Sequence, residues 1–222
     1  MKDLINKIHQ ADCLEFMKQL PDNSIDLVLT DPPYGISADK NMKKVANTKS
    51  KNSLAYKKDY GDTDWDKFSP TKEYFDEIFR ISKNQIIFGG NYFTDKIPQS
   101  NGWLVWDKKV EDKYSNNFSD AELIWTSYNK GTNIYRFLWH GMLQQNMKQK
   151  EFRHHPTQKP VALMQQIITD YTGENDTILD PFAGSGSTCV AAQNLHRRFI
   201  GIELDEKYCE IARDRLKQQT LI

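Results

Sequence analysis

The chain has 222 residues, enough for one domain with a buried core. Its 38% hydrophobic and 27% charged residues are typical of globular proteins. No apolar run approaches the roughly 20 residues that span a bilayer, so we expect no membrane contact and a cytoplasmic location. The 30 basic residues balance the 30 acidic ones, so the overall charge does not indicate attraction to nucleic acid. The three cysteines and five histidines lack metal-ligand spacing, and we expect no metal.

The first half of the chain is predicted to alternate helices with strands. Residues 12–20 have amphipathic spacing and end at Pro21, whereas residues 25–30 form an apolar run that stops at Pro32 and Pro33. Apolar spacing also predicts a helix over residues 71–81, followed by strands over residues 86–88, 103–106 and 122–125. Residues 128–152 are rich in aromatic side chains but have no regular pattern.

The second half alternates short apolar strands with helices. It is predicted to contain a helix over 161–171 that follows Pro160, a strand over 177–180, a helix over 187–194, a strand over 199–202 and a helix over 205–218. Asp205 has a side chain typical of a helix N-cap. This alternation predicts an α/β fold, with a mostly parallel sheet covered by helices on both faces, in a single domain over residues 1–222.

Two segments carry a local excess of positive charge. Residues 40–58 contain seven lysines and no acid, within a polar stretch over 37–63 that we expect to be a mobile surface loop. Residues 130–153 contain five basic residues and one acid, Glu151. Each segment is interpreted either as a contact for nucleic-acid phosphates or as a solvated loop.

A glycine-containing loop, Asp180-Pro181-Phe182-Ala183-Gly184-Ser185-Gly186, follows the predicted strand over 177–180. Glycines let a ligand approach the backbone, and Glu203, at the end of the next predicted strand, has the spacing of an acid that binds ribose hydroxyls. Cys189 replaces the third glycine of the dinucleotide pattern, and Asp180 would repel a pyrophosphate. The loop therefore favours S-adenosylmethionine over NAD, with a purely structural turn as the alternative.

The other candidate site is the turn Asp31-Pro32-Pro33-Tyr34. The exocyclic amine of adenine is a poor nucleophile because its lone pair is delocalised into the ring. Two acceptors for its N–H groups, the Asp31 carboxylate and the Pro32 carbonyl, would push the nitrogen toward tetrahedral geometry and free that lone pair. Tyr34 could stack on the base near a sulfonium methyl. The turn thus predicts direct methyl transfer to an amine; the alternative is a Pro-Pro turn with an accidental tyrosine.

With both motifs present, nearly the whole chain resembles the β class of DNA amino-methyltransferases, whose motifs are circularly permuted. The Asp31 turn resembles the catalytic motif of that class, and residues 182–186 resemble its cofactor loop. The segment His155-Pro156-Thr157-Gln158-Lys159-Pro160 resembles the part that cradles the methionine end of the cofactor. Asp12 matches the acid that binds the adenine amine of the cofactor. The catalytic motif precedes the cofactor motif, which is the β-class order.

The resemblance implies a Rossmann-like methyltransferase fold, in which the strands before Asp12, Asp31, Asp180 and Glu203 all end at one edge of the sheet. It also assigns the site residues. The catalytic residues are Asp31, Pro32, Pro33 and Tyr34. The cofactor-binding residues are Asp12, Asp31, Thr157, Lys159, Asp180, Phe182, Ala183, Gly184, Ser185, Gly186 and Glu203.

The target base is expected to be adenine, because cytosine-N4 enzymes of the family usually have serine where Asp31 stands. Cytosine-C5 chemistry needs a cysteine that normally follows a proline, and no cysteine here does so. We therefore expect site-specific N6 methylation of a flipped-out adenine in double-stranded DNA, with residues 130–153 as a short target-recognition segment. The open alternatives are a cytosine-N4 enzyme, an RNA or protein amino-methyltransferase, an inactive DNA-binding regulator and an NAD oxidoreductase. A homodimer and a cognate restriction endonuclease are also left open.

Overall fold

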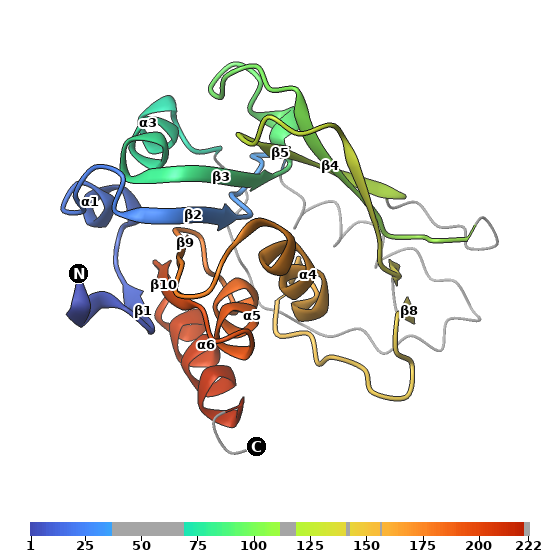
Figure 1. Cartoon of the computed structure of the whole chain (residues 1–222). Coiled ribbons are helices and arrows are strands. Elements are labelled where there is room, and N and C mark those ends of the chain that lie inside the picture. The colour runs from blue at the N-terminus through green and yellow to red at the C-terminus, as the bar shows by residue number, and fades with distance from the viewer. Residues whose placement is uncertain (37–68, 112–118, 141–142, 156, 220–222) are drawn as a thin grey trace.

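A central eight-stranded sheet organises the chain (Figure 1). In spatial order it consists of β1 (Lys7–Gln10), β10 (Arg198–Glu203), β9 (Thr177–Asp180), β2 (Ile25–Thr30), β3 (Ser82–Phe88), β5 (Ala121–Thr126), β4 (Gly102–Asp107) and β6 (Asn133–Arg136). The computed structural model describes residues 1–36, 69–111, 119–140, 143–155 and 157–219, so the loop predicted over 37–63 lies outside the described residues. The first five strands are parallel, and β5 is antiparallel to β3 and β4. The prediction of a mostly parallel sheet is confirmed.

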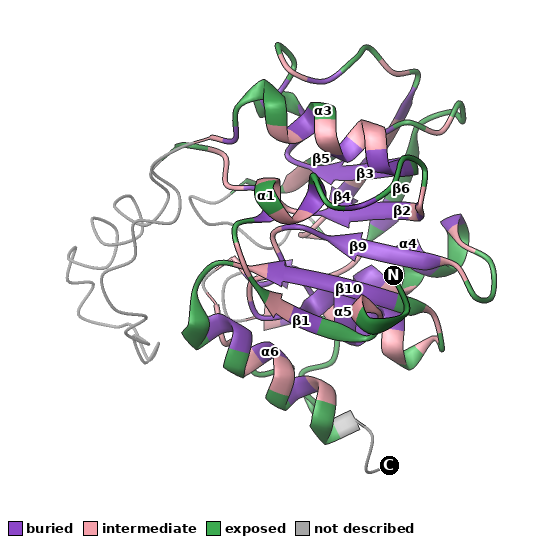
Figure 2. Ribbon diagram, turned by 90° about the vertical axis from the view of Figure 1, so that its left-hand side faces the viewer, coloured by how far each residue is buried: buried purple, intermediate pink, exposed green. Residues whose placement is uncertain are grey.

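Helices cover both faces of this sheet (Figures 1 and 2). On one face lie α1 (Cys13–Met17) and α3 (Lys72–Ile81), and on the other lie α4 (Val161–Tyr171), α5 (Ser187–Asn194) and α6 (Glu206–Gln219). Alternate strand residues enter the two cores: Val28 packs with the first pair of helices, whereas Leu29 packs with the other three. Because both faces are buried, the central strands have nearly continuous apolar sequences.

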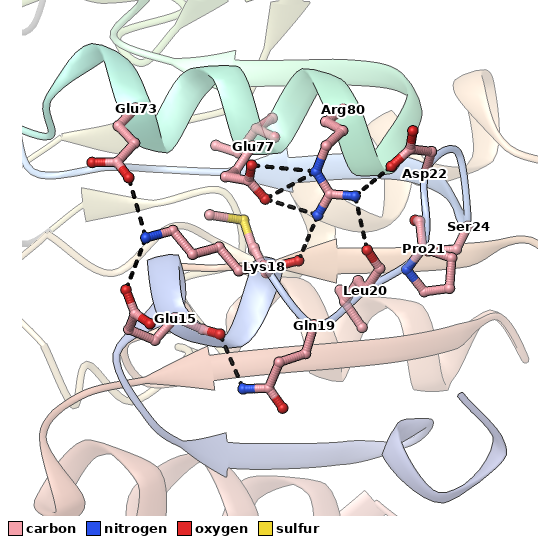
Figure 3. A network of polar contacts seen from close by, with 12 residues as sticks. Glu15, Lys18, Gln19, Leu20, Pro21, Asp22, Ser24, Glu73, Glu77 and Arg80 are labelled. Atoms are coloured by element: carbon pink, nitrogen blue, oxygen red, sulfur yellow. Dashed lines mark hydrogen bonds and ion pairs between the residues drawn. The ribbon is translucent and has the colours of Figure 1, made fainter.

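Arg80, near the end of α3, joins that helix to α1 (Figure 3). Its guanidinium donates hydrogen bonds to the carbonyls of Met17 at 3.0 Å and Leu20 at 2.9 Å. It also pairs with Glu77 at 2.8 Å and with Asp22 at 2.5 Å. A helix as short as α1 has little stability of its own, so these tertiary contacts hold it in place.

Most predicted elements are present, and α4, β9 and α5 have the predicted bounds. Asp205 caps α6 as expected, because its carboxylate accepts the Lys207 amide at 2.9 Å. β3 begins at Ser82, before the apolar residues that predicted it, because its polar first half already pairs with β2. In the described part of the chain, no helix is long and apolar enough to cross a membrane.

The sequence of residues 128–152 has no regular pattern, and no strand was predicted there, but the structure forms short strands. The segment contains β6 at the sheet edge and an antiparallel pair of strands, β7 (Trp139–His140) and β8 (Leu143–Gln144). These strands are too short to show an alternating pattern. The edge strand β1 also lacked a pattern, because Ile8 is its single buried residue.

Candidate active site

Four acidic residues meet at the carboxyl edge of the sheet. β1, β10, β9 and β2 are successive parallel neighbours, and each ends at or just before one acid: Asp12, Glu203, Asp180 and Asp31, respectively. The carboxyl ends of parallel strands form the edge where open α/β sheets bind their ligands. The predicted convergence of these four residues is therefore confirmed.

The Asp31 carboxylate has two partners from different parts of the chain. Its Oδ1 accepts a hydrogen bond from the Tyr34 hydroxyl at 2.7 Å, and its Oδ2 contacts the ammonium group of Lys159. Burial raises the pKa of Asp31, and the positive charge of Lys159 opposes this increase. The predicted catalytic turn is thus in direct contact with the segment predicted to bind the methionine end of the cofactor.

Residues that follow β3 hold the Tyr34 ring. The ring stacks on Tyr92, with centroids 4.6 Å apart and planes 17° apart, and meets Phe93 edge-on at 6.0 Å. Gly89 has a φ of +64°, and a Cβ at this position would lie 2.2 Å from the Tyr34 ring. Burial raises the pKa of Tyr34 well above its usual value, so its hydroxyl remains a hydrogen-bond donor. Neither Gly89 nor Tyr92 was predicted to have a function.

Lys159 lies between two largely buried carboxylates, those of Asp31 and Glu122. On β5, Glu122 is 3.4 Å from Lys159 Nζ through Oε2 and 3.1 Å from Lys108 Nζ through Oε1. Burial by itself raises the pKa of Glu122, but the two ammonium groups outweigh it and hold this pKa below its usual value. Glu122 was not predicted as a site residue, although it is the one charged residue in the apolar run of β5.

The Asp180 carboxylate joins β9 to β2. It is buried, and its Oδ1 accepts hydrogen bonds from the Thr30 hydroxyl at 2.8 Å and the Phe182 amide at 3.2 Å. Burial raises the pKa of Asp180 to about 6, although hydrogen bonds from Thr188 and Thr30 oppose this increase. These bonds fix the start of the glycine loop next to the strand that ends at Asp31.

The two glycines of the loop have different environments. Gly184 has a φ of +51° and donates its amide to Glu203 Oε2 at 2.8 Å. A Cβ on Gly184 would meet none of the described atoms within 4 Å, so this side of the loop has room for a ligand. Gly186 has a φ of +80°, and a Cβ there would lie 2.8 Å from the Cβ of Ala212 on α6. Gly186 therefore allows close packing, whereas Gly184 faces the candidate ligand site.

A polar network behind the loop was not predicted. Arg215 on α6 donates to the Ser185 carbonyl at 2.6 Å and to Glu151 Oε1 at 2.9 Å. Gln158 accepts a hydrogen bond from the Ser185 hydroxyl at 3.1 Å and donates to Glu151 at 2.7 Å. Arg215 gave no sequence signal, because α6 carries many other charged residues. The network joins the glycine loop to Glu151 and to Gln158, which both precede α4 in the sequence.

Asp12 and Thr157 have partners within their own segments. Asp12 is exposed, and its Oδ1 caps α1 by accepting the amides of Leu14 at 2.9 Å and Glu15 at 3.1 Å. The Thr157 hydroxyl lies 2.9 Å from Nδ1 of His155. Burial lowers the pKa of His155 to about 4, so this imidazole is neutral at pH 7. Pro156, between them, lies outside the described residues.

Two further observations delimit the site. Among the described residues, no group of three or more His, Cys, Asp or Glu side chains could hold a metal ion. A cavity of about 600 Å³ is lined by the first residues of β1 and β10 together with parts of α5 and α6. It lies at the amino edge of the sheet and is separate from the acidic edge.

The fold and the site together define a Rossmann-like methyltransferase, and comparisons with known proteins identify the family. A sequence model of the N6/N4 DNA methylases matches residues 103–214. The type II methyltransferase M2.LlaDCHI of Lactococcus lactis subsp. cremoris is 30% identical, over 94% of this chain and 88% of its own length. The type II methyltransferase M.HinfI of Haemophilus influenzae is 29% identical, over 98% of this chain and 70% of its own length.

A solved structure has the same fold. The complex of M1.HpyAVI with S-adenosylmethionine superposes with a TM-score of 0.56 and 24% identity, covering 95% of this chain and 99% of the other. The chain belongs to the N6/N4 DNA methylase family, and it is a DNA methyltransferase.

Proposed function

We propose that this chain transfers a methyl group from S-adenosylmethionine to the N6 amino group of a flipped-out adenine in double-stranded DNA. The position of Asp31 carries this proposal. Asp31 follows β2, the direct neighbour of β9, and the glycine loop follows β9. A hydrogen-bond acceptor for an amine therefore lies next to a loop suited to a nucleoside.

The residues of this edge fit S-adenosylmethionine. The cofactor is cationic at its sulfonium and its ammonium, and Asp31, Asp180 and Glu203 supply carboxylates. Gly184 leaves open space beside the loop, and Glu203 has the place of a ribose-binding acid. The proposed binding residues are Asp12, Asp31, Thr157, Lys159, Asp180, Phe182, Ala183, Gly184, Ser185, Gly186 and Glu203. When bound, the cofactor supplies an electrophilic methyl group.

The Asp31 turn would act on the amine. The Asp31 carboxylate accepts one N–H, and the Pro32 carbonyl accepts the other, which frees the nitrogen lone pair for in-line attack. The charge on Lys159 favours the ionised carboxylate that this function requires, against the effect of burial. Tyr34 stacks on the extruded base, and its hydroxyl holds the Asp31 carboxylate in place. The β-class assignment, with its permuted motif order, is part of the same proposal.

Cytosine N4 is the second candidate target, because the matching family includes both N6 and N4 methylases. The discriminating experiment is methylation of duplex DNA with tritiated S-adenosylmethionine, followed by digestion to nucleosides and chromatography. We expect the label in N6-methyladenine, and its loss in Asp31→Ala. Label in N4-methylcytosine would support the second candidate. Label in RNA or protein, with none in DNA, would refute the proposed substrate.

Residues 130–153 are the proposed target-recognition segment. Three of their large apolar side chains are exposed, namely Ile134 at 53%, Met147 at 49% and Phe152 at 63%. The Arg153 guanidinium lies 4.3 Å from the centroid of the Trp139 ring. Exposed apolar side chains beside cations suit contacts with bases and phosphates. We also propose the cytoplasm as the location. A cognate restriction endonuclease is suggested by the type II relatives, and a homodimer is a further proposal.

A further inference from the structure

Four buried or largely buried charges of alternating sign extend from β4 to the catalytic turn. Lys108 pairs with Glu122, Glu122 pairs with Lys159, and Lys159 pairs with Asp31. The side chain of Lys159 is only 7% exposed, and those of Asp31 and Glu122 are each 21% exposed. One buried ammonium group, that of Lys159, is thus shared by two carboxylates that are largely shielded from solvent.

The contact between Lys159 and Asp31 conflicts with the proposed chemistry. Asp31 must accept an N–H from the target amine, which is a much weaker donor than an ammonium group. Lys159 contacts Oδ2, and Oδ1 already accepts the Tyr34 hydroxyl at 2.7 Å. Each carboxylate oxygen can accept a second donor, but the ammonium is the stronger one, so the amine binds Asp31 best when Lys159 moves away. A buried ammonium that loses its partner is strongly unfavourable, so Lys159 needs another anion within reach.

Glu122 has the capacity to receive this ammonium group. Its Oε2 is buried and accepts no hydrogen bond from any described residue, although it lies 3.4 Å from Lys159 Nζ. Its Oε1 is held by Lys108 at 3.1 Å, which leaves Oε2 for Lys159. Because Nζ is already 3.4 Å from Oε2, only a small displacement of the ammonium group is needed for a full hydrogen bond.

We propose that Glu122 is a positioning residue for methyl transfer, which holds the Lys159 ammonium group while Asp31 accepts the amine of the target base. Glu122 does not touch the base; it acts by keeping Lys159 away from the Asp31 oxygen. This inference rests on the proposed function, because it requires Asp31 to be the acceptor of the amine.

Glu122→Gln tests the inference, because it keeps the size of the side chain and removes its charge. We expect Lys159 to remain on Asp31 in this variant. With saturating cofactor and duplex DNA, kcat should fall roughly tenfold or more, while the KM for S-adenosylmethionine stays within about threefold of the wild type. Glu122→Asp restores the charge on a shorter side chain and should recover part of kcat. A kcat of Glu122→Gln equal to that of the wild type would overturn the proposal.

A double variant separates this function from a merely structural one. Glu122→Gln combined with Lys159→Met also removes the blocking ammonium group. At a pH high enough to keep Asp31 ionised without Lys159, it should therefore methylate faster than Glu122→Gln alone, whereas independent losses would make it slower. Saturating cofactor keeps a loss of cofactor affinity out of this comparison. A double variant that is no faster than the single variant would contradict the proposal.

Glu73→Gln is the matched control. Glu73 has a side chain that is 59% exposed and pairs with Lys18 at 3.1 Å on the surface between α1 and α3 (Figure 3). The same chemical change there should leave kcat unaltered. If the Glu122 variants do not fold, the wild-type protein still gives a test. A crystal structure with duplex DNA and S-adenosylhomocysteine should place Lys159 on Glu122, and Lys159 still on Asp31 beside a bound amine would refute the proposal.

Different results would refute the proposed methylation of adenine and the proposed function of Glu122. Wild-type protein that transfers no label to adenine would refute the proposed function. Active wild-type protein whose kcat is unaffected by Glu122→Gln would refute only the function of Glu122.

Discussion

Gly89→Ala should show how closely Tyr34 depends on the backbone beside it. Gly89 has a φ of +64°, a conformation that costs an alanine about 1–2 kcal/mol. The new Cβ would lie 2.2 Å from Cε1 and 2.5 Å from Cζ of Tyr34, and overpacking of this kind costs about 1–3 kcal/mol. Together, these contributions should lower the free energy of unfolding by roughly 2–5 kcal/mol if the ring stays in place.

If the Tyr34 ring moves instead, the loss should appear in activity. The ring would leave its stack on Tyr92 and its hydrogen bond to Asp31. Urea denaturation measures the first outcome, and single-turnover methylation of duplex DNA measures the second. Gly131→Ala is the control for stability, because a Cβ there would meet none of the described atoms within 4 Å. A Gly89→Ala protein with both wild-type stability and the wild-type rate would refute this account.

Three further predictions concern the cofactor loop, pH dependence and α1. Glu203→Ala should weaken S-adenosylmethionine binding by about 1.5–3 kcal/mol in calorimetry, and unchanged affinity would mean that the ribose is held elsewhere. Because the pKa of Asp180 rises from 3.8 to about 6 on folding, the folded state binds the proton more tightly, so the free energy of unfolding should fall as pH rises through this window. The free energy of unfolding should change by roughly 3 kcal/mol across this window. If its slope against pH were the same for Asp180→Asn as for the wild type, the prediction would be contradicted. Arg80→Leu should lower the free energy of unfolding by about 1–2 kcal/mol, because it removes the hydrogen bonds to Met17 and Leu20. Lys72→Met, which breaks an exposed ion pair, is the control and should cost less. Equal losses would count against a stabilising contact between Arg80 and α1.

Local sequence was sufficient where the chemistry or the pattern is local. The Asp31 turn and the glycine loop each place their groups within a few consecutive residues, so both were recognisable before any fold was known. Apolar patterns likewise gave the bounds of α4 and β9, and a run of mostly small residues after Gly186 gave those of α5. Short or edge strands, such as β1 and β6, bury too few side chains to produce such a pattern.

The contacts that combine these parts into a site were decided by the tertiary structure. Lys159 meets Asp31 across 128 residues of sequence, and the Thr30 hydroxyl reaches Asp180 across 150. Glu122 enters the same cluster because β5 inserts antiparallel between β3 and β4. An apolar pattern shows that a strand is buried, but it does not specify its neighbours. The pairing of distant strands therefore determined which charged side chains lie together in the site. Those neighbouring charges in turn set the electrostatic environment of Asp31.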